Sequence, residues 1–186
     1  MRGQSHLCLG RYLAKQYMRG LPAVYIRAFL VGCIEPDRNP ATYLKGSLRC
    51  QCLRGHNYGN ARRFMKRISR RLENKDKLKL FDFYTLGKLI HYTADAFTYA
   101  HNPDFPTQLK NHMEYELQLQ NHFLTYLSGN PQVIPMPAKS IMDTICRYHR
   151  EYEQTERSVS SDSLFALTAC CCILAALFTG PVLKPC

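Results

Sequence analysis

The sequence predicts an all-α protein, a single-domain helical bundle spanning residues 1–186. Apolar residues recur every three or four positions through most of the chain, which is the spacing of helices that bury one face. No alternating run predicts a strand, and no internal repeat or nucleotide-binding glycine motif is visible. The length suits one domain with its own core, which we assign to residues 5–158.

Seven helices are expected, separated by proline, glycine or charged connections. They are residues 5–19, 23–34, 56–74, 81–100, 107–127, 138–156 and 162–178. Pro22 and the run 129–131 mark breaks, and Thr107 is a candidate N-cap of the fifth helix. The second helix is expected to end before a stiff loop, 35–40, whose two prolines hold Asp37 outside the helix, pointing into a cleft.

Charge is concentrated in the helix at 56–74. The chain has 25 Lys and Arg against 14 Asp and Glu, a formal net charge of +11, which favours an anionic partner such as phospholipid or nucleic acid. Six basic residues of this helix lie off its apolar stripe: Arg62, Arg63, Lys66, Arg67, Arg70 and Arg71. Two interpretations stay open, a solvated helix face and a surface that holds anionic lipid head groups or nucleic acid.

The cysteines and the two ends of the chain bear on location. Nine cysteines, three of them adjacent at 170–172, are a poor layout for disulfides and favour a reducing compartment. The first 20 residues lack the apolar core of a secretory signal peptide, so we expect a cytoplasmic protein. Residues 163–183 are uncharged and just long enough to span a bilayer, which leaves membrane association open. Gly180 and Pro181 interrupt this segment, which favours a buried core helix over a membrane anchor.

Several His, Asp and Glu residues have the spacing of metal ligands. Residues four apart share one face of a helix, so His91 with Asp95 and His112 with Glu116 can each hold one ion. His101 comes ten residues after His91. It would lie roughly 80° round the same helix, which suits a neighbouring ion. Any one pair alone is more often a structural or solvated contact, whereas the combination favours a metal site.

With three further residues, this pattern resembles the zinc-dependent phospholipase C family, whose all-α fold is shared with the S1/P1-type nucleases. The family pattern is a His near the N-terminus, an Asp in a loop, a His at a helix start, His-x3-Asp, a His ten residues after the first of that pair, and His-x3-Glu or His-x3-Asp. The matching residues here, over about 5–127, are His6, Asp37, His56, His91, Asp95, His101, His112 and Glu116.

The resemblance implies a cluster of two or three zinc ions between the helices. By similarity, the ligands are His56, His91 and Asp95 for the first zinc, with Asp37 as ligand or catalytic base; His101, His112 and Glu116 for the second; and His6 with a bridging Asp95 for the third. Secreted members begin with a Trp that completes the third site, whereas this sequence has no Trp. The resemblance therefore leaves the choice between two and three ions open.

The activity implied by the resemblance is phosphodiester hydrolysis by metal-activated water. A phospholipase C would cleave a glycerophospholipid to diacylglycerol and a phosphorylated head group, a step of lipid degradation. Two alternatives are an S1/P1-like nuclease or other phosphodiesterase, and a non-catalytic zinc-binding protein associated with membranes. The basic helix fits the nuclease, although no obvious platform of exposed aromatic residues predicts base stacking.

Overall fold

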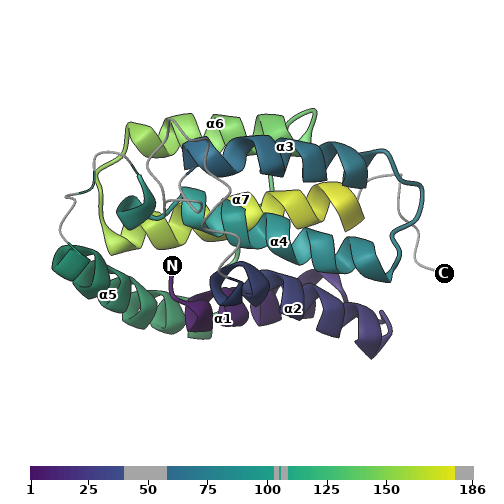
Figure 1. The fold of residues 1–186 in the computed structure, drawn as a ribbon, viewed down its shortest axis with the longest axis horizontal. Helices are drawn as coiled ribbons and strands as arrows, with labels where there is room; N and C mark the ends of the chain where they lie inside the picture. The colour runs from purple at the N-terminus through teal and green to yellow at the C-terminus, as the bar shows by residue number, and fades with distance from the viewer. Residues whose placement is uncertain (40–57, 103–104, 106–108, 179–186) are drawn as a thin grey trace.

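The computed structural model describes residues 1–39, 58–102, 105 and 109–178 (Figure 1). Its helices are α1 (Gly3–Tyr17), α2 (Ala23–Arg38), α3 (Tyr58–Glu73), α4 (Leu80–Ala96), α5 (Leu109–Ser128), α6 (Ile141–Glu153) and α7 (Val159–Phe178), with a 3-10 turn, η2, at Tyr99–His101. No strand occurs in these described ranges, so the all-α prediction is confirmed. His56, Thr107, Gly180 and Pro181 lie outside them.

The helices form three layers, with α4 and α7 in the middle one (Figure 1). Helices α3 and α6 cover one side, and α1, α2 and α5 cover the other. Every residue from 89 to 96 of α4 is buried, including the polar ones. The His-x3-Asp pair therefore lies inside the molecule, where a polar side chain needs a partner.

Helix α7 lies against α4, α5 and α6. Among the described residues it is the one helix long and apolar enough to cross a membrane, with a mean hydropathy of 1.9 and 72% of that window buried. Length and apolar composition are shared by core helices and membrane spans, so they decide little by themselves. In this fold its apolar side chains, from Ala166 to Leu177, pack into the core.

Two glycines let α2 and α4 approach each other closely. A Cβ at Gly87 would overlap the Phe29 carbonyl oxygen, and Gly32 is equally tight against the backbone of α4. Without side chains at these positions the two backbones come into contact. The same crossing brings the Cys33 carbonyl oxygen to 2.9 Å from His91 Nδ1. The glycine contact thus sets the distance between the end of α2 and the His-x3-Asp pair.

The predicted loop at 35–40 is wrong for residues 35–38, because α2 continues through Pro36 to Arg38. A proline inside a helix removes one backbone hydrogen bond. Here the missing hydrogen bond belongs to the last turns of the helix, and the Pro36 residue is buried. After the proline, the Asn39 N–H still donates to the Glu35 carbonyl, as in a helix. Asp37 therefore lies in the last helical turn rather than in a loop.

The predicted helix at 81–100 is also wrong at its end, because α4 stops at Ala96. The Phe97 N–H donates to the Ala94 carbonyl, a bond over three residues instead of four, which tightens the chain into a 3-10 pattern. The Asn102 side chain donates to the Thr98 carbonyl at 2.9 Å and stabilises the turn that follows. His101 therefore belongs to η2 and not to the helix that carries His91.

Candidate metal centre

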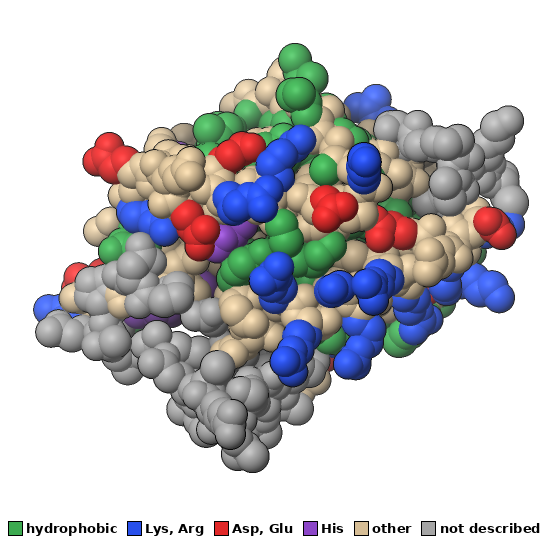
Figure 2. Space-filling model, turned by 90° about the horizontal axis from the view of Figure 1, so that it is seen from above, with side chains coloured by type: hydrophobic (Ala, Val, Ile, Leu, Met, Phe, Trp, Pro, Cys, Tyr) green, Lys and Arg blue, Asp and Glu red, His purple; other side chains and the backbone are tan. Residues whose placement is uncertain are grey.

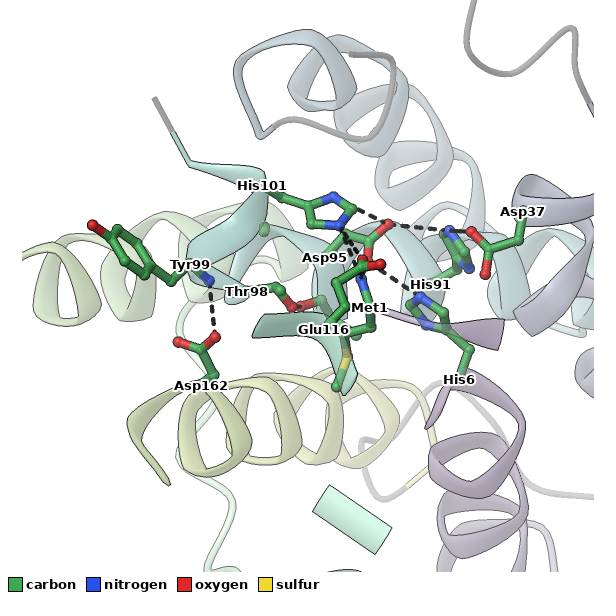
Figure 3. A network of polar contacts seen from close by, with 12 residues as sticks. Met1, His6, Asp37, His91, Asp95, Thr98, Tyr99, His101, Glu116 and Asp162 are labelled. Atoms are coloured by element: carbon green, nitrogen blue, oxygen red, sulfur yellow. Dashed lines mark hydrogen bonds and ion pairs between the residues drawn. The ribbon is translucent and has the colours of Figure 1, made fainter. Parts of the chain in front are cut away.

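Two groups of candidate metal ligands lie side by side at the C-terminal end of α4 (Figure 3). Within each group, one ligand atom per residue lies within 4.8 Å of the others. The groups are His6, His91 and Asp95, and His101, His112 and Glu116. Asp95 joins them, since its Oδ2 lies 3.2 Å from His91 Nε2 and 3.8 Å from His101 Nδ1.

The first group is fully buried and comes from α1 and α4. The rings of His6 and His91 stack with centroids 3.8 Å apart, and each directs its Nε2 to an Asp95 oxygen at 3.2 Å. Because the Cys33 carbonyl accepts only, His91 Nδ1 is the donor in their hydrogen bond. In the neutral form of this ring, Nε2 presents a lone pair toward a carboxylate, an arrangement that a cation between them would relieve.

His6 lacks a hydrogen-bond partner suited to its burial. Neither of its ring nitrogens makes a hydrogen bond of normal geometry with a described residue. Burial, together with the neighbouring His91 ring, lowers the pKa of His6 to about 4, so the ring is neutral at pH 7. A buried neutral imidazole without a hydrogen bond is costly unless its lone pair is used, as it is in a metal ligand.

Asp37 extends the first group from the end of α2. Its Oδ1 lies 3.6 Å from His91 Nε2, and its side chain is 21% exposed. The structure thus brings Asp37 next to the first group. His56, which the family resemblance assigns to the first zinc, lies outside the described residues.

The second group is more open and comes from η2 and α5. Glu116 lies between two imidazoles, with Oε1 3.1 Å from His101 Nε2 and Oε2 3.8 Å from His112 Nδ1. Burial opposes the charge of Glu116, but the Met1 ammonium and His101 outweigh it and lower its pKa to about 2. Since these side chains are 12–34% exposed, a water or a substrate atom can reach the group.

The amino group of Met1 lies between the two groups. It is 2.7 Å from Asp95 Oδ1, 3.2 Å from Glu116 Oε1 and 3.0 Å from His101 Nε2 (Figure 3). Burial alone would lower the pKa of this amine, but the two carboxylates raise it to about 10. The acceptors therefore already surround a positive charge. Side-chain spacing does not predict this contact, although the family resemblance places an N-terminal residue at the third zinc site.

Asp95 is a fully buried carboxylate between several positively polarised groups. Burial would raise its pKa, yet the Met1 ammonium and the rings of His101, His6 and His91 hold that pKa well below its usual range. The carboxylate is thus ionised while fully buried, which requires nearby positive charge. Imidazole nitrogens and carboxylate oxygens are normal zinc ligands, so the donor set fits zinc.

The two other histidines have partners away from the centre. His122 Nδ1 is 2.9 Å from Ser163 Oγ, and the His149 ring stacks on Tyr58 with centroids 3.7 Å apart. These contacts bind helices to each other. Neither histidine belongs to the two ligand groups found among the described residues.

Comparison with known proteins identifies the family. The family model described as zinc-dependent phospholipase C matches residues 5–171, most of the chain. The protein therefore belongs to the zinc-dependent phospholipase C family, a family of hydrolases. No match was found among curated proteins or among solved structures.

Proposed function

We propose that this protein is a zinc-dependent phosphodiester hydrolase that cleaves a glycerophospholipid on the glycerol side of the phosphate. The products are diacylglycerol and a phosphorylated head group. The observation that carries the proposal is the pair of ligand groups joined at Asp95, with Oδ2 3.2 Å from one group's His91 and 3.8 Å from the other's His101. Two adjacent metal positions are the usual arrangement for displacement at phosphorus.

The charges of the site favour bound dications in addition to the Met1 ammonium. Asp37, Asp95 and Glu116 bring three carboxylates, whereas a neutral imidazole brings no charge. The single Met1 ammonium only partly offsets these carboxylates, so without metal ions they would still repel a phosphodiester anion. Two dications would more than neutralise them and make the site attractive to phosphate.

The residues then have distinct proposed roles. When bound, zinc lowers the pKa of a water to about 7 and stabilises the attacking and leaving oxygens. His91 is oriented by its Nδ1 hydrogen bond to Cys33, and the buried Asp95 holds the two ligand groups together. Asp37 is the candidate general base, because it is partly exposed beside His91 and can accept a proton from the attacking water.

We further propose that the protein acts in the cytoplasm on an anionic membrane surface. The described cysteines are free thiols, as expected in a reducing compartment. Figure 2 shows many Lys and Arg side chains on one face of the molecule, with several Asp and Glu side chains among them. The exposed basic residues of α3 are Arg62, Arg63, Lys66, Arg67, Arg70 and Arg71. The same basic helix favours the second candidate, a nuclease or other phosphodiesterase.

The test combines zinc counting with two substrates. Protein purified without chelator should contain two or three zinc ions by native mass spectrometry and should hydrolyse a chromogenic phosphocholine diester. Chelation should abolish hydrolysis, and added zinc should restore it. Protein without bound zinc would contradict both the phospholipase and the nuclease proposals. Bound zinc with hydrolysis of single-stranded DNA alone would favour the nuclease, and bound zinc with neither activity would favour a non-catalytic protein.

A further inference from the structure

A buried carboxylate, Asp162, lies behind the second ligand group in the first turn of α7. Its side chain is fully buried and receives three hydrogen bonds. Oδ2 accepts from the Tyr99 backbone N–H at 2.8 Å and from the Tyr115 hydroxyl at 2.8 Å, and Oδ1 accepts from the Tyr152 hydroxyl at 2.6 Å. The donors belong to η2, α5 and α6, so one side chain connects four elements of the fold.

The three partners are donors in these bonds. Burial, reinforced by the Asp162 charge, raises the pKa of both the Tyr115 and the Tyr152 phenols, which stay protonated. Burial raises the pKa of Asp162 itself, whereas these three hydrogen bonds and the unpaired N–H groups of the first helical turn favour its charged form. Hydrogen bonds to a charged group are stronger than those between neutral groups. Asp162 therefore fixes the positions of the segments whose groups donate hydrogen bonds to it.

Two of these segments carry candidate zinc ligands. Tyr99 is in the same 3-10 turn as His101, and Tyr115 directly precedes Glu116 on α5. Because α4 ends at Ala96, its helical hydrogen bonds do not set the position of His101. The Tyr99 bond to Asp162 holds that turn, which Figure 3 shows beside the ligand cluster.

We infer that Asp162 is a positioning residue that ties the turn carrying His101 to the helix carrying Glu116. Through its hydrogen bonds, Asp162 keeps His101 Nε2 and Glu116 Oε1 directed at one common point. These two atoms are 3.1 Å apart. Ligand geometry of this kind depends on the hydrogen bonds behind the ligands. The inference rests on the proposed function only in that the second group holds zinc.

The test compares three substitutions in the full chain. Asp162→Asn removes the carboxylate charge, and Tyr115→Phe removes the hydroxyl on the ligand-bearing helix. Both should weaken zinc binding by about 10- to 100-fold in a chelator competition titration. Tyr152→Phe is the matched control, since it removes a hydroxyl from the same carboxylate on α6, which carries no candidate ligand. It should change zinc affinity by no more than about twofold.

Cobalt substitution and thermal unfolding separate positioning from stability alone. The visible absorption of bound cobalt should change in Asp162→Asn and Tyr115→Phe and stay as in the wild type in Tyr152→Phe. Unchanged zinc affinity in both test variants, or an equal loss in the control, would overturn the inference even if the melting temperature falls. Should Asp162→Asn fail to fold, Tyr115→Phe still decides.

The proposed function is judged by a different measurement. A wild-type protein that binds zinc but hydrolyses no phosphodiester would contradict the proposed function. The zinc affinities of the variants would still test whether Asp162 positions the second ligand group. A wild-type protein without zinc affinity would contradict both.

Discussion

At the scale of single residues, Asp95 is the side chain on which the two ligand groups meet. Asp95→Asn keeps the volume but removes the charge, so the helix should still pack while the cations lose their shared partner. Hydrolysis should fall by more than about 100-fold, since even residues that only orient metal ligands are worth about 10- to 100-fold. The measurements are hydrolysis, bound zinc and helical content by circular dichroism.

The matched control is Asp82→Asn, the same change at another buried carboxylate of α4. Asp82 bonds to Lys75 at 2.6 Å and to the Lys79 backbone N–H, at the opposite end of the helix from Asp95. This variant should lose stability but keep its zinc. Near wild-type hydrolysis by Asp95→Asn would show that the centre lies elsewhere.

Helix periodicity alone accounts for part of the candidate site. His91 and Asp95 share a helix face whatever the fold, and the same is true of His112 and Glu116, so sequence spacing predicts both pairs. No sequence spacing predicts that Asp162 supports the second ligand group. It acts through backbone and side chains far away in the chain, and only the packing of α7 reveals it.

At the scale of elements, the start of α4 depends on Asp82. Its carboxylate caps the helix at the Lys79 N–H and pairs with Lys75 and Arg71. Burial opposes ionisation, but Lys75 and the other donors outweigh it and lower the pKa below the ordinary 3.8. A lowered folded-state pKa gives stability that is fully present above the unfolded value and is lost as the pH falls through the folded one.

Asp82→Asn should therefore cost about 1.5–3 kcal/mol in the free energy of unfolding at neutral pH. The difference from the wild type should begin to shrink as the pH falls below about 4, where the wild-type carboxylate also starts to lose its charge. Urea unfolding of both proteins at several pH values, in the presence of chelator, measures it. A difference that stays constant into the acid range would argue against the ion pair.

The close crossing of α2 and α4 makes a second prediction about elements. Gly87→Ala places a methyl group against the Phe29 carbonyl, so the helices must separate. Overpacking of this kind costs about 1–3 kcal/mol. Because α2 carries Asp37 and the Cys33 carbonyl that orients His91, zinc affinity should fall as well.

Gly129→Ala is the control for that substitution, since the atom nearest to its new Cβ would be 3.4 Å away. It should change stability by less than about 0.5 kcal/mol. Thermal unfolding and zinc titration compare the two variants. Equal stability of Gly87→Ala and the wild type would mean that the backbones are not in contact.

Sequence predicts the existence of each helix better than its ends. The amphipathic stripes of α3 and α6 give those helices directly, because burial follows the stripe. The predicted ends of the helices that contain Pro36 and Ala96 are wrong, because tertiary contacts decide there whether a helix continues. Local propensity is a weak guide where a buried ring or a side-chain bond such as Asn102 to Thr98 stabilises the alternative.

At the scale of the whole molecule, two features bear on membranes in opposite ways. The net charge of +11, with an exposed basic helix, favours contact with anionic lipid. The apolar α7 is engaged in the core, and its buried Asp162 is bonded to three other elements. Withdrawing that helix into lipid would break these bonds, so surface attraction is the expected mode of contact.

We therefore expect reversible binding to vesicles of phosphatidylserine and phosphatidylcholine, measured by co-sedimentation. The protein should stay soluble without detergent, bind at low salt and leave the vesicles at about 1 M salt, where charges are screened beyond about 3 Å. Each basic residue near a membrane contributes about 1 kcal/mol, so Arg63→Glu with Arg67→Glu should weaken binding at least about tenfold. Lys15→Glu with Arg19→Glu makes the same change of net charge at exposed positions in and just after α1, which lies in the layer opposite α3, and should have a smaller effect. Binding that resists salt and yields only to detergent would instead indicate that α7 enters the bilayer.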